Sequence, residues 1–280
     1  MFKLIENKMI VPNIFQATIE APDVTNAVEP GNFVILRVVE DGERIPLTVS
    51  DWDKNRGTIT LVYMNVGKTT DLLASLPVGA SLPTVVGPLG NTMDTSYYGT
   101  VLCVGGCYGI GSIYPIARAL KEKGNTVYTM IEARSSFLFY WQEKHKSVAD
   151  KLILLTRDGS IGTHGHMNTL PGIIASFPKP IDRIIINGCN YMMMRGCQET
   201  KPMNIRTIVS LNTLMIDGTG MCGVCRVSVD SQTKFACVDG PHFDGHLVDW
   251  DELTNRRKAY LHEETIPLRS SRPHSEHPLL

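Results

Sequence analysis

Three cysteines in the C-terminal third of the chain have the spacing of a metal centre. Cys222, Cys225 and Cys237 form the pattern C-x2-C-x11-C, so two thiolates can grip a metal from one tight loop while the third returns from a hairpin. Plant-type [2Fe–2S] proteins have the spacing C-x4-C-x2-C followed by a distant cysteine. Counting back five residues from Cys222 gives Asp217, which completes D-x4-C-x2-C-x11-C. The spacing therefore predicts a [2Fe–2S] cluster with Asp217 as its fourth ligand.

Alternatives to this cluster stay open. A structural zinc site also accepts three cysteines and one nitrogen or oxygen ligand, and His242 and His246 are near enough in sequence to serve. The cysteines could instead be buried without a ligand, and Asp217 could simply form a turn with the glycine that follows it. A carboxylate has the charge of a thiolate but is a harder donor, so an aspartate ligand is expected to raise the reduction potential.

A second candidate site is the glycine-rich segment VLCVGGCYGIG. It places Gly105, Gly106, Gly109 and Gly111 between an expected strand and an expected helix. Amides at a helix start, together with the helix dipole, attract anions, and the pyrophosphate of a dinucleotide suits such a loop. The spacing is not G-x-G-x-x-G, so the glycines could also serve only close strand–helix packing.

Residues that follow the next strands bear on the nucleotide. Glu132 can accept hydrogen bonds from ribose hydroxyls, which favours NAD(H), whereas Arg134 and the serines after it can hold a 2′-phosphate, which favours NADP(H). The two cues conflict, so both nucleotides stay open. Asp158 and Cys189 also follow strands, at the sheet edge where such folds bind ligands. The remaining cysteines are interpreted as packing residues: Cys103, Cys107 and Cys197.

The elements that must position these residues fall into successive segments. Residues 1–97 contain short alternating strands separated by turn signals, which predicts an antiparallel β-barrel. Residues 98–212 alternate strands with helices, including a helix over 135–150, which predicts a doubly wound parallel α/β domain. Residues 213–264 form the small cluster lobe, and 265–280 a Pro-, Ser- and His-rich tail. The fold class is therefore a β-barrel plus α/β with a C-terminal lobe.

Composition excludes several classes of protein. The chain has 280 residues and a formal net charge of −1, which leaves no basic excess for nucleic-acid binding. The first residues lack the apolar core of a secretory signal, and the longest uncharged stretch, 95–117, contains five glycines and a proline, so we expect no membrane span. We expect a cytoplasmic protein, in which its seven cysteines stay reduced.

These motifs together resemble a known superfamily. Over about its first 210 residues the chain resembles the ferredoxin–NADP reductase superfamily. The segments IDGTGMCGVCRV and FACVDGPHFDGHLVDWDEL narrow this to subunits with an appended [2Fe–2S] lobe. One branch is the electron-transfer subunit of dihydroorotate dehydrogenase. The other is the small subunit of electron-bifurcating NADH-dependent reduced ferredoxin:NADP oxidoreductase, also described as a sulfide dehydrogenase subunit. An aspartate replaces one cluster cysteine in this second branch, as Asp217 does here.

The resemblance also implies FAD. The superfamily binds the flavin through an R-x-Y-(S/T) motif on a barrel strand, and here the matching segment begins at Arg44, whose guanidinium suits the pyrophosphate. Pro46 stands where the motif has an aromatic residue. The hydroxyl residue of the motif is Thr48, one position later than in the superfamily pattern. The flavin-binding segment comprises Arg44, Pro46, Leu47, Thr48, Val49 and Ser50. A second element comprises Tyr63, Gly67, Lys68, Thr69 and Thr70.

The resemblance implies an electron-transfer function without a general base or nucleophile. Electrons would pass between a nicotinamide nucleotide, FAD and the [2Fe–2S] cluster, to or from a larger flavin and [4Fe–4S] subunit, and indirectly ferredoxin. The alternatives are electron supply to a dihydroorotate dehydrogenase and, from a different class, a zinc-stabilised binding module without catalysis. The tail is expected to help dock the larger subunit.

Overall fold

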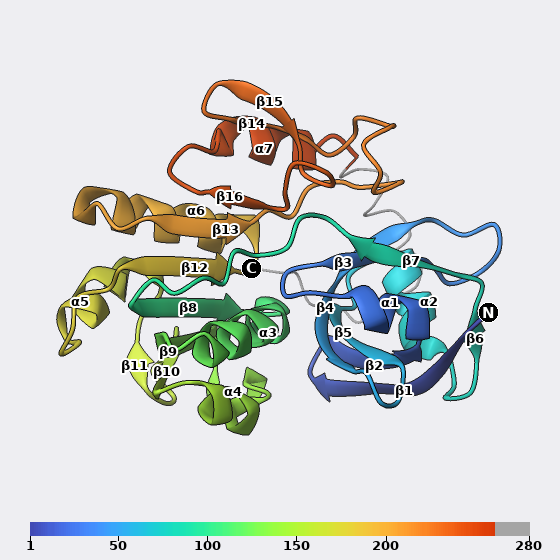
Figure 1. Ribbon diagram of the computed structural model, residues 1–280, viewed down its shortest axis with the longest axis horizontal. Coiled ribbons are helices and arrows are strands. Elements are labelled where there is room, and N and C mark those ends of the chain that lie inside the picture. Colours follow the sequence, from blue (N-terminus) through green and yellow to red (C-terminus); the bar gives the residue numbers. More distant parts are fainter. Residues whose placement is uncertain (261–280) are drawn as a thin grey trace, which may run out of the picture.

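The N-terminal part of the computed structural model, which describes residues 1–260, is a nearly closed antiparallel barrel (Figure 1). The strand order is β6-β1-β2-β5-β4-β3-β7, and short helices α1 (Pro22–Ala27) and α2 (Lys68–Ser75) lie between strands. Alternating side chains fill the barrel interior, as expected for strands with one buried face. The strands are β1 (Phe2–Val11), β2 (Ile14–Glu20), β3 (Phe33–Arg37), β4 (Ile45–Asp53), β5 (Thr58–Met64), β6 (Ser81–Leu82) and β7 (Thr84–Leu89).

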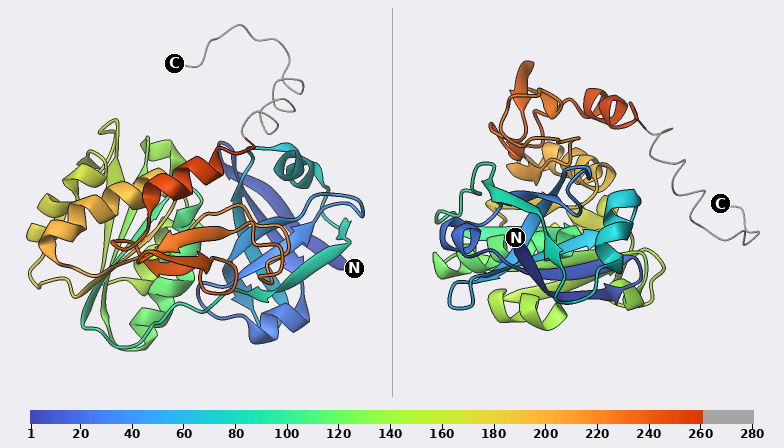
Figure 2. Two further views of the ribbon diagram at one scale, coloured as in Figure 1. Left: turned by 90° about the horizontal axis from the view of Figure 1, so that it is seen from above. Right: turned by 90° about the vertical axis from the view of Figure 1, so that its right-hand side faces the viewer.

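The middle part is a doubly wound sheet with the order β11-β10-β9-β8-β12-β13-β16. All neighbouring strands are parallel except β16, which joins the edge antiparallel to β13. Helices cover both faces of this sheet (Figures 1 and 2). The strands are β8 (Thr100–Gly106), β9 (Thr126–Ala133), β10 (Lys151–Thr156), β11 (Thr163–His164), β12 (Arg183–Asn187), β13 (Thr207–Ser210) and β16 (His242–Asp244). The helices are α3 (Gly109–Glu122), α4 (Gln142–Val148), α5 (Leu170–Ala175) and α6 (Asn190–Thr200), with 3-10 turns at Ser136–Leu138, Met167–Thr169 and Lys201–Met203.

The continuous helix predicted over 135–150 is wrong. A 3-10 turn at Ser136–Leu138 is separated from α4 by Trp141, whose backbone is left-handed with φ 55°. The indole Nε1–H of Trp141 donates to Gln16 Oε1 of the barrel at 3.0 Å. A contact between distant parts of the chain therefore overrides the local helical preference.

The C-terminal part is a small lobe held at the edge of the parallel sheet (Figure 1). The hairpin of β14 (Arg226–Val229) and β15 (Gln232–Phe235) turns at Asp230 and Ser231, both with positive φ. Helix α7 (Trp250–Arg257) begins where the Asp249 carboxylate accepts from Glu252 N at 2.8 Å. Because β16 of this lobe pairs with β13, the lobe is built onto the sheet rather than tethered to it.

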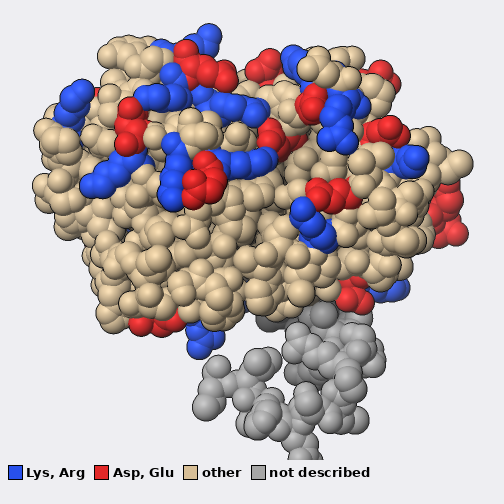
Figure 3. All heavy atoms as spheres, turned by 90° about the horizontal axis from the view of Figure 1, so that it is seen from below, with Lys and Arg blue, Asp and Glu red and all other residues tan. Residues whose placement is uncertain are grey.

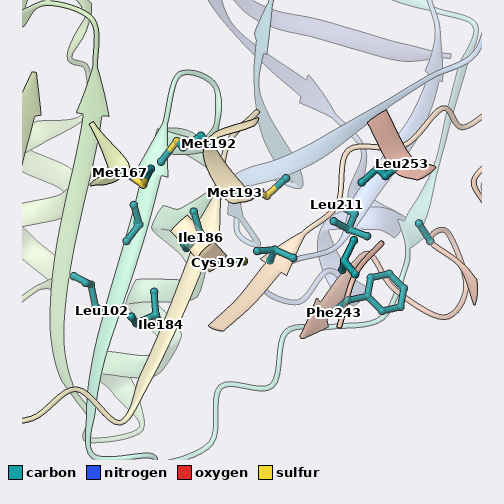
Figure 4. Packing of buried hydrophobic residues seen from close by; sticks show 14 of the residues in the cluster. Leu102, Met167, Ile184, Ile186, Met192, Met193, Cys197, Leu211, Phe243 and Leu253 are labelled. Carbon is teal, nitrogen blue, oxygen red and sulfur yellow. The ribbon is translucent and has the colours of Figure 1, made fainter. Parts of the chain in front are cut away.

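One hydrophobic core joins the sheet to the lobe. Met193 and Cys197 of α6 lie toward Leu211, and Phe243 and Leu253 of the lobe continue the same cluster (Figure 4). Cys103 and Cys197 are buried, together with Met192 and Met193, so the interpretation of these two cysteines as packing residues is confirmed. Cys107 is only half-buried.

On the face shown in Figure 3, lysines and arginines are interspersed with aspartates and glutamates, so this face has no large patch of one charge. Within residues 1–260, no helix has the length and apolar character needed to cross a bilayer. The tail predicted at 265–280, and residues 261–264 of the predicted lobe, lie outside the described residues.

Candidate functional site

The hairpin of the lobe brings two of the predicted cluster ligands together. Cys225 precedes β14 and Cys237 follows β15, and their Sγ atoms are 3.2 Å apart. Both residues are almost fully buried, and burial raises the pKa of the Cys237 thiol to about 12. A thiol with this pKa ligates only after a metal displaces its proton.

The other two predicted ligands lie on one turn of the same loop. Asp217 Oδ2 accepts from Cys222 N at 2.9 Å, and its Oδ1 accepts from Thr219 N at 2.9 Å. The side chain of Cys222 is exposed at this turn. Within residues 1–260, no three His, Cys, Asp or Glu side chains converge on one metal position. The structure thus brings the thiols of Cys225 and Cys237 together and links the Asp217 carboxylate to the backbone of Cys222. A dinuclear cluster would need two protein ligands for each iron.

Three glycines shape the loop that carries Asp217 and Cys222. Gly218, Gly220 and Gly223 all have positive φ, between 67° and 87°. A Cβ at Gly218 would lie 2.8 Å from Leu89 Cδ1 and 2.9 Å from Ile35 Cγ1. The cluster loop is thus seated directly on barrel strands β3 and β7.

The histidines considered as zinc ligands are engaged elsewhere. His242 Nδ1 lies 2.8 Å from Ser210 Oγ, and His246 Nε2 lies 2.9 Å from Thr200 Oγ1. Burial lowers the pKa of His242 to about 4, so its ring stays neutral near physiological pH. Neither imidazole is part of the cysteine loop.

The flavin segment alternates along β4. Leu47 and Val49 pack with the barrel core and can offer a ligand only their backbone. Pro46, Thr48 and Ser50 share the opposite face. Ser50 is fully buried beneath α3, and its hydroxyl has no partner within residues 1–260. This face of β4, opposite the barrel core, is therefore the one open to a flavin at Pro46 and Thr48.

In the second predicted flavin element, some side chains are exposed and others already have hydrogen-bond partners in the protein. Arg44 and Lys68 are exposed, and Lys68 begins α2 directly after Gly67. Thr69 Oγ1 donates to Glu43 Oε2 at 2.7 Å, whereas Thr70 Oγ1 accepts from Gly67 N at 3.0 Å. The Thr70 hydroxyl thus stabilises the turn at the helix start.

Tyr63 does not belong with these residues. It is 1% exposed in the barrel core, stacks on Phe15, and its hydroxyl donates to Asn7 Oδ1 at 3.2 Å. A ring enclosed in this way has no surface to offer a flavin, so we exclude it from the proposed site.

The glycine-rich loop is closely packed against its surroundings. A Cβ at Gly105 would lie 2.8 Å from Gly109 O, and one at Gly111 would lie 2.8 Å from Val62 of the barrel. A Cβ at Gly109 would collide with the Asn187 carbonyl. The Gly111 amide donates to Tyr140 Oη at 2.9 Å, so this first-turn donor is already used. Packing alone accounts for these three glycines.

Glu132 is the next-to-last residue of β9, pairs with Gly106 of the loop strand, and is 3% exposed. Its Oε1 accepts from Arg157 Nε at 2.6 Å, and its Oε2 would lie 3.0 Å from a Cβ at Gly106. Arg134 is exposed at the same edge. Asp158 is exposed too, and hydrogen bonds from Ser160 and Ser135 lower its pKa to about 2. The edge therefore holds a buried carboxylate paired with Arg157, and Arg134 and Asp158 are exposed near it in the chain.

Cys189 is an exposed thiol at the start of α6, across from the glycine loop. The neighbouring loop is tied down by Tyr108, whose hydroxyl donates to Gly188 O at 3.0 Å and accepts from Asn212 Nδ2 at 2.8 Å. This network links the glycine loop to the segment that leads into the cluster lobe.

Sequence reasoning missed two groups of residues. Arg157, the partner of Glu132, carries no motif. Asp51 joins the barrel to the sheet domain by accepting from Arg118 Nη1 at 2.8 Å and Lys144 Nζ at 2.7 Å. The sequence gives one signal for Asp51: it directly follows Ser50, the last residue of the predicted flavin-binding segment.

Comparisons with known proteins agree with this geometry. Residues 212–249 match the iron–sulfur cluster binding domain of dihydroorotate dehydrogenase B. The chain is 41% identical over 264 residues to the dihydroorotate dehydrogenase B (NAD(+)) electron transfer subunit homolog of Thermotoga maritima, covering 94% of this chain and 93% of that protein. It is 27% identical over 258 residues to the electron transfer subunit of dihydroorotate dehydrogenase B from Enterococcus faecalis, covering 89% and 97%.

Solved structures give the same result. A chain from the NADH-dependent reduced ferredoxin-NADP oxidoreductase, studied for flavin-based electron bifurcation, superposes with a TM-score of 0.91 at 39% identity and covers 96% of this chain and 97% of that one. The ferredoxin NADP+ reductase of Neisseria gonorrhoeae shares the fold, with a TM-score of 0.61 at 15% identity over 72% of this chain and 90% of that one. The expected superfamily is confirmed, and the chain belongs to the family of electron-transfer subunits that carry an iron–sulfur domain on a ferredoxin-reductase-like fold.

Proposed function

We propose that this chain is the small subunit of an electron-bifurcating NADH-dependent reduced ferredoxin:NADP oxidoreductase. It would bind FAD, a [2Fe–2S] cluster and NAD(H) or NADP(H), and would exchange electrons with a larger flavin and [4Fe–4S] subunit. When bound, the flavin and the cluster supply the conversion between two-electron hydride exchange and one-electron transfer.

One observation carries this proposal: the predicted cluster loop is seated on the barrel strand next to the predicted flavin strand. Gly218 abuts Ile35 of β3, and Ile35 pairs with Pro46 of β4. Gly218 directly follows the proposed ligand Asp217, so the loop that would carry the cluster would lie one strand away from the face that carries Thr48. Two redox groups bound at these places would be neighbours, with protein supplying their orientation.

Separate sets of residues would bind FAD and the nicotinamide nucleotide. Arg44, Lys68 and the amides near Gly67 would hold the flavin pyrophosphate, and Thr48 would hydrogen-bond near the ring. The crevice edge at Gly106, Glu132, Arg134 and Asp158 would hold the nicotinamide nucleotide, with Cys189 near the nicotinamide. The side chains of Leu47 and Val49 would only support β4 from the barrel interior.

Cofactor content tests the proposal. We expect anaerobically purified protein to be yellow-brown, with one flavin and two irons per chain and an electron paramagnetic resonance signal after reduction. A colourless protein that contains zinc would contradict the electron-transfer function and would support the alternative of a zinc-stabilised binding module without catalysis.

Electron supply to a dihydroorotate dehydrogenase is the second candidate, favoured by similarity to the dihydroorotate dehydrogenase B subunits. The aspartate at position 217 argues against it, because we expect that branch to carry cysteine there. Purification from the native source separates the two: a copurifying flavin and [4Fe–4S] subunit supports bifurcation, and a pyrimidine-forming partner overturns it.

A further inference from the structure

A histidine beside the proposed nucleotide site has no role so far. His166 directly precedes the 3-10 turn Met167–Thr169, and its ring stacks on Tyr191 of α6 with centroids 6.0 Å apart. Its Nε2 atom lies 3.8 Å from Glu132 Oε1, just beyond hydrogen-bond distance. This nitrogen is buried, and it has no hydrogen-bond partner among residues 1–260. Because buried polar atoms are nearly always paired, the unused nitrogen indicates an interaction that forms in another state of the site.

The carboxylate oxygen that faces His166 already has a cation. Glu132 Oε1 accepts from Arg157 Nε at 2.6 Å, and the Glu132 side chain is 4% exposed. A carboxylate buried to this degree needs a positive partner, because removing one partner of a buried ion pair leaves an uncompensated charge. His166 therefore lies where a second partner for the same oxygen would be.

Arg157 has hydrogen-bonding capacity left for a ligand. Its side chain is 46% exposed, and its guanidinium donates to the described residues through Nε alone. Arg157 directly follows β10, at the carboxyl edge of the sheet, where such folds bind ligands. A phosphate group bound here would accept from the remaining guanidinium donors and would share the positive charge that now compensates Glu132.

His166 is neutral at pH 7 while this arginine charge is unshared. Burial contributes most to lowering the pKa of its imidazole, the positive charge of Arg157 lowers that pKa too, and the Glu132 carboxylate opposes both. The other groups that face the imidazole belong to α6: the Arg195 guanidinium lowers the same pKa, and Tyr191 stacks on the ring. Histidine has the ordinary pKa nearest to 7 among these groups, so it is the one that can take up a proton at neutral pH.

We propose that His166 is a positioning residue that takes up a proton from solvent when a phosphate group of the nicotinamide nucleotide binds Arg157. The phosphate cancels the arginine charge that keeps the imidazole neutral, and the imidazolium then donates from Nε2 to Glu132. The buried carboxylate thus keeps a positive partner while Arg157 holds the ligand. The inference rests on the proposed function for the nucleotide, and it makes the affinity for that nucleotide depend on pH.

The direction of the pH effect follows from the exchange of partners. The pKa of His166 is higher in the complex than in the free protein, so binding takes up a proton between the two pKa values. In that window the affinity falls as pH rises, by up to about tenfold per pH unit for one proton. Below the lower pKa the imidazole is protonated in both states, and above the higher pKa it is neutral in both, so the affinity is constant there.

Calorimetric titration of the protein with its cofactors, using NAD⁺ and NADP⁺ separately, measures the proton uptake. Each titration is made at pH 7 in two buffers of different ionisation enthalpy, and the difference in heat gives the protons taken up, expected to approach about one. His166→Gln should abolish the uptake and weaken binding about tenfold or more, because Glu132 then lacks a full partner. Glu132→Gln should also abolish the uptake, because a neutral amide needs no cation. Glu143→Gln, the same substitution on the exposed surface of α4, is the matched control and should leave uptake and affinity unchanged.

The two nucleotides identify the phosphate that binds Arg157. Uptake with NAD⁺ assigns it to the pyrophosphate, which both nucleotides share, and uptake with NADP⁺ alone assigns it to the 2′-phosphate. Binding without uptake, or uptake that persists in His166→Gln, overturns this inference and leaves the proposed function standing. Failure of both nucleotides to bind overturns the proposed nucleotide site and this inference with it. Circular dichroism checks that each variant is folded.

Discussion

At the cluster loop, Asp217 holds the position where a cysteine would complete the plant-type spacing. The Thr219 and Cys222 backbone N–H groups donate to its carboxylate, and the hydrogen bond from Thr219 contributes most to lowering its pKa. The group is thus an anion at neutral pH, with the charge of a thiolate but a harder oxygen donor.

Replacing Asp217 with cysteine should lower the reduction potential of the cluster, because a softer and stronger donor stabilises the oxidised irons. A redox titration followed by electron paramagnetic resonance measures the change. Asp230→Asn, in the hairpin turn of the same lobe, is the control and should leave the potential unaltered. An unchanged potential in Asp217→Cys would remove Asp217 from the ligand set.

Glu132 is the residue whose role the structure changes most. The sequence could place it at the end of a strand, but its ion pair with Arg157 depends on the register of β9 against β10, 25 residues away. Such partners have no local signal. By contrast, the spacing of Cys222, Cys225 and Cys237 is local and was readable directly.

Glu132→Gln should shift nucleotide preference toward NADPH by about tenfold, because it removes a carboxylate and frees Arg157 for a 2′-phosphate. The ratio of kcat/KM for NADPH and NADH measures this. Glu143→Gln, on the exposed surface of α4, should leave the ratio unaltered. A constant ratio in Glu132→Gln would place the ribose elsewhere.

Among the elements, the N-terminal barrel and the alternation of strands with helices that follows it could be predicted, because alternating or continuous apolar residues are typical of strands. The helix predicted at 135–150 failed because Trp141 turns toward Gln16 of the barrel. The addition of β16 to the parallel sheet was also unpredictable, since its three residues carry no pattern of their own.

Strand β4 and helices α3 and α4 meet at Asp51. Its two ion pairs, with Arg118 and Lys144, connect the flavin strand with the two helices of the sheet domain. Arg118 also lies 4.8 Å from the centre of the Trp52 ring. This contact therefore joins the predicted flavin strand to the domain of the predicted nucleotide site.

Asp51→Asn should slow hydride transfer from NADH to the flavin about tenfold while leaving flavin content unchanged, because small misplacements of reacting groups are costly. Stopped-flow absorbance of flavin reduction measures the rate. Glu143→Gln removes an ion pair confined to α4 and serves as the control. Equal rates in both variants would show that packing alone orients the domains.

Helix α4 also makes stability depend on pH. His145 is fully buried against α3, where its Nε2 lies 2.9 Å from Ile110 O, and burial lowers its pKa to about 4. Above the unfolded pKa of about 6.5, both states are neutral and the histidine contributes no pH dependence. As pH falls from 6.5 toward 4, only the unfolded chain takes up the proton, so the folded state loses stability.

The loss should reach about 2 kcal/mol at pH 5, at roughly 1.4 kcal/mol per pKa unit of separation. Urea unfolding at pH 7 and pH 5 measures it, and His145→Gln should reduce the difference between the two pH values. Exposed His164→Gln is the control. A difference that survives unchanged in His145→Gln would assign the effect to other groups.

Across the whole molecule, the cluster lobe touches both other parts. It pairs with the sheet through β16 and β13, and it packs on the barrel where Gly218 meets Leu89 and Ile35. A Cβ at Gly90 of the barrel would likewise lie 2.9 Å from Pro241 of the lobe. These contacts leave little freedom for the lobe to shift relative to the flavin strand.

Gly218→Ala tests whether this close seating matters for electron transfer. The added methyl would meet Leu89 and Ile35 at 2.8 and 2.9 Å and would force a left-handed backbone on alanine, at φ 75°. We expect the loop to lift from the barrel, with slower electron transfer from flavin to cluster in stopped-flow traces. Gly79→Ala is the matched control, since Gly79 has φ 92° but nothing within 4 Å of its Cβ. It shares the backbone strain of roughly 1–2 kcal/mol without the collision. If both variants retain iron and transfer electrons at the wild-type rate, the contact serves stability alone and the flavin-to-cluster path runs elsewhere.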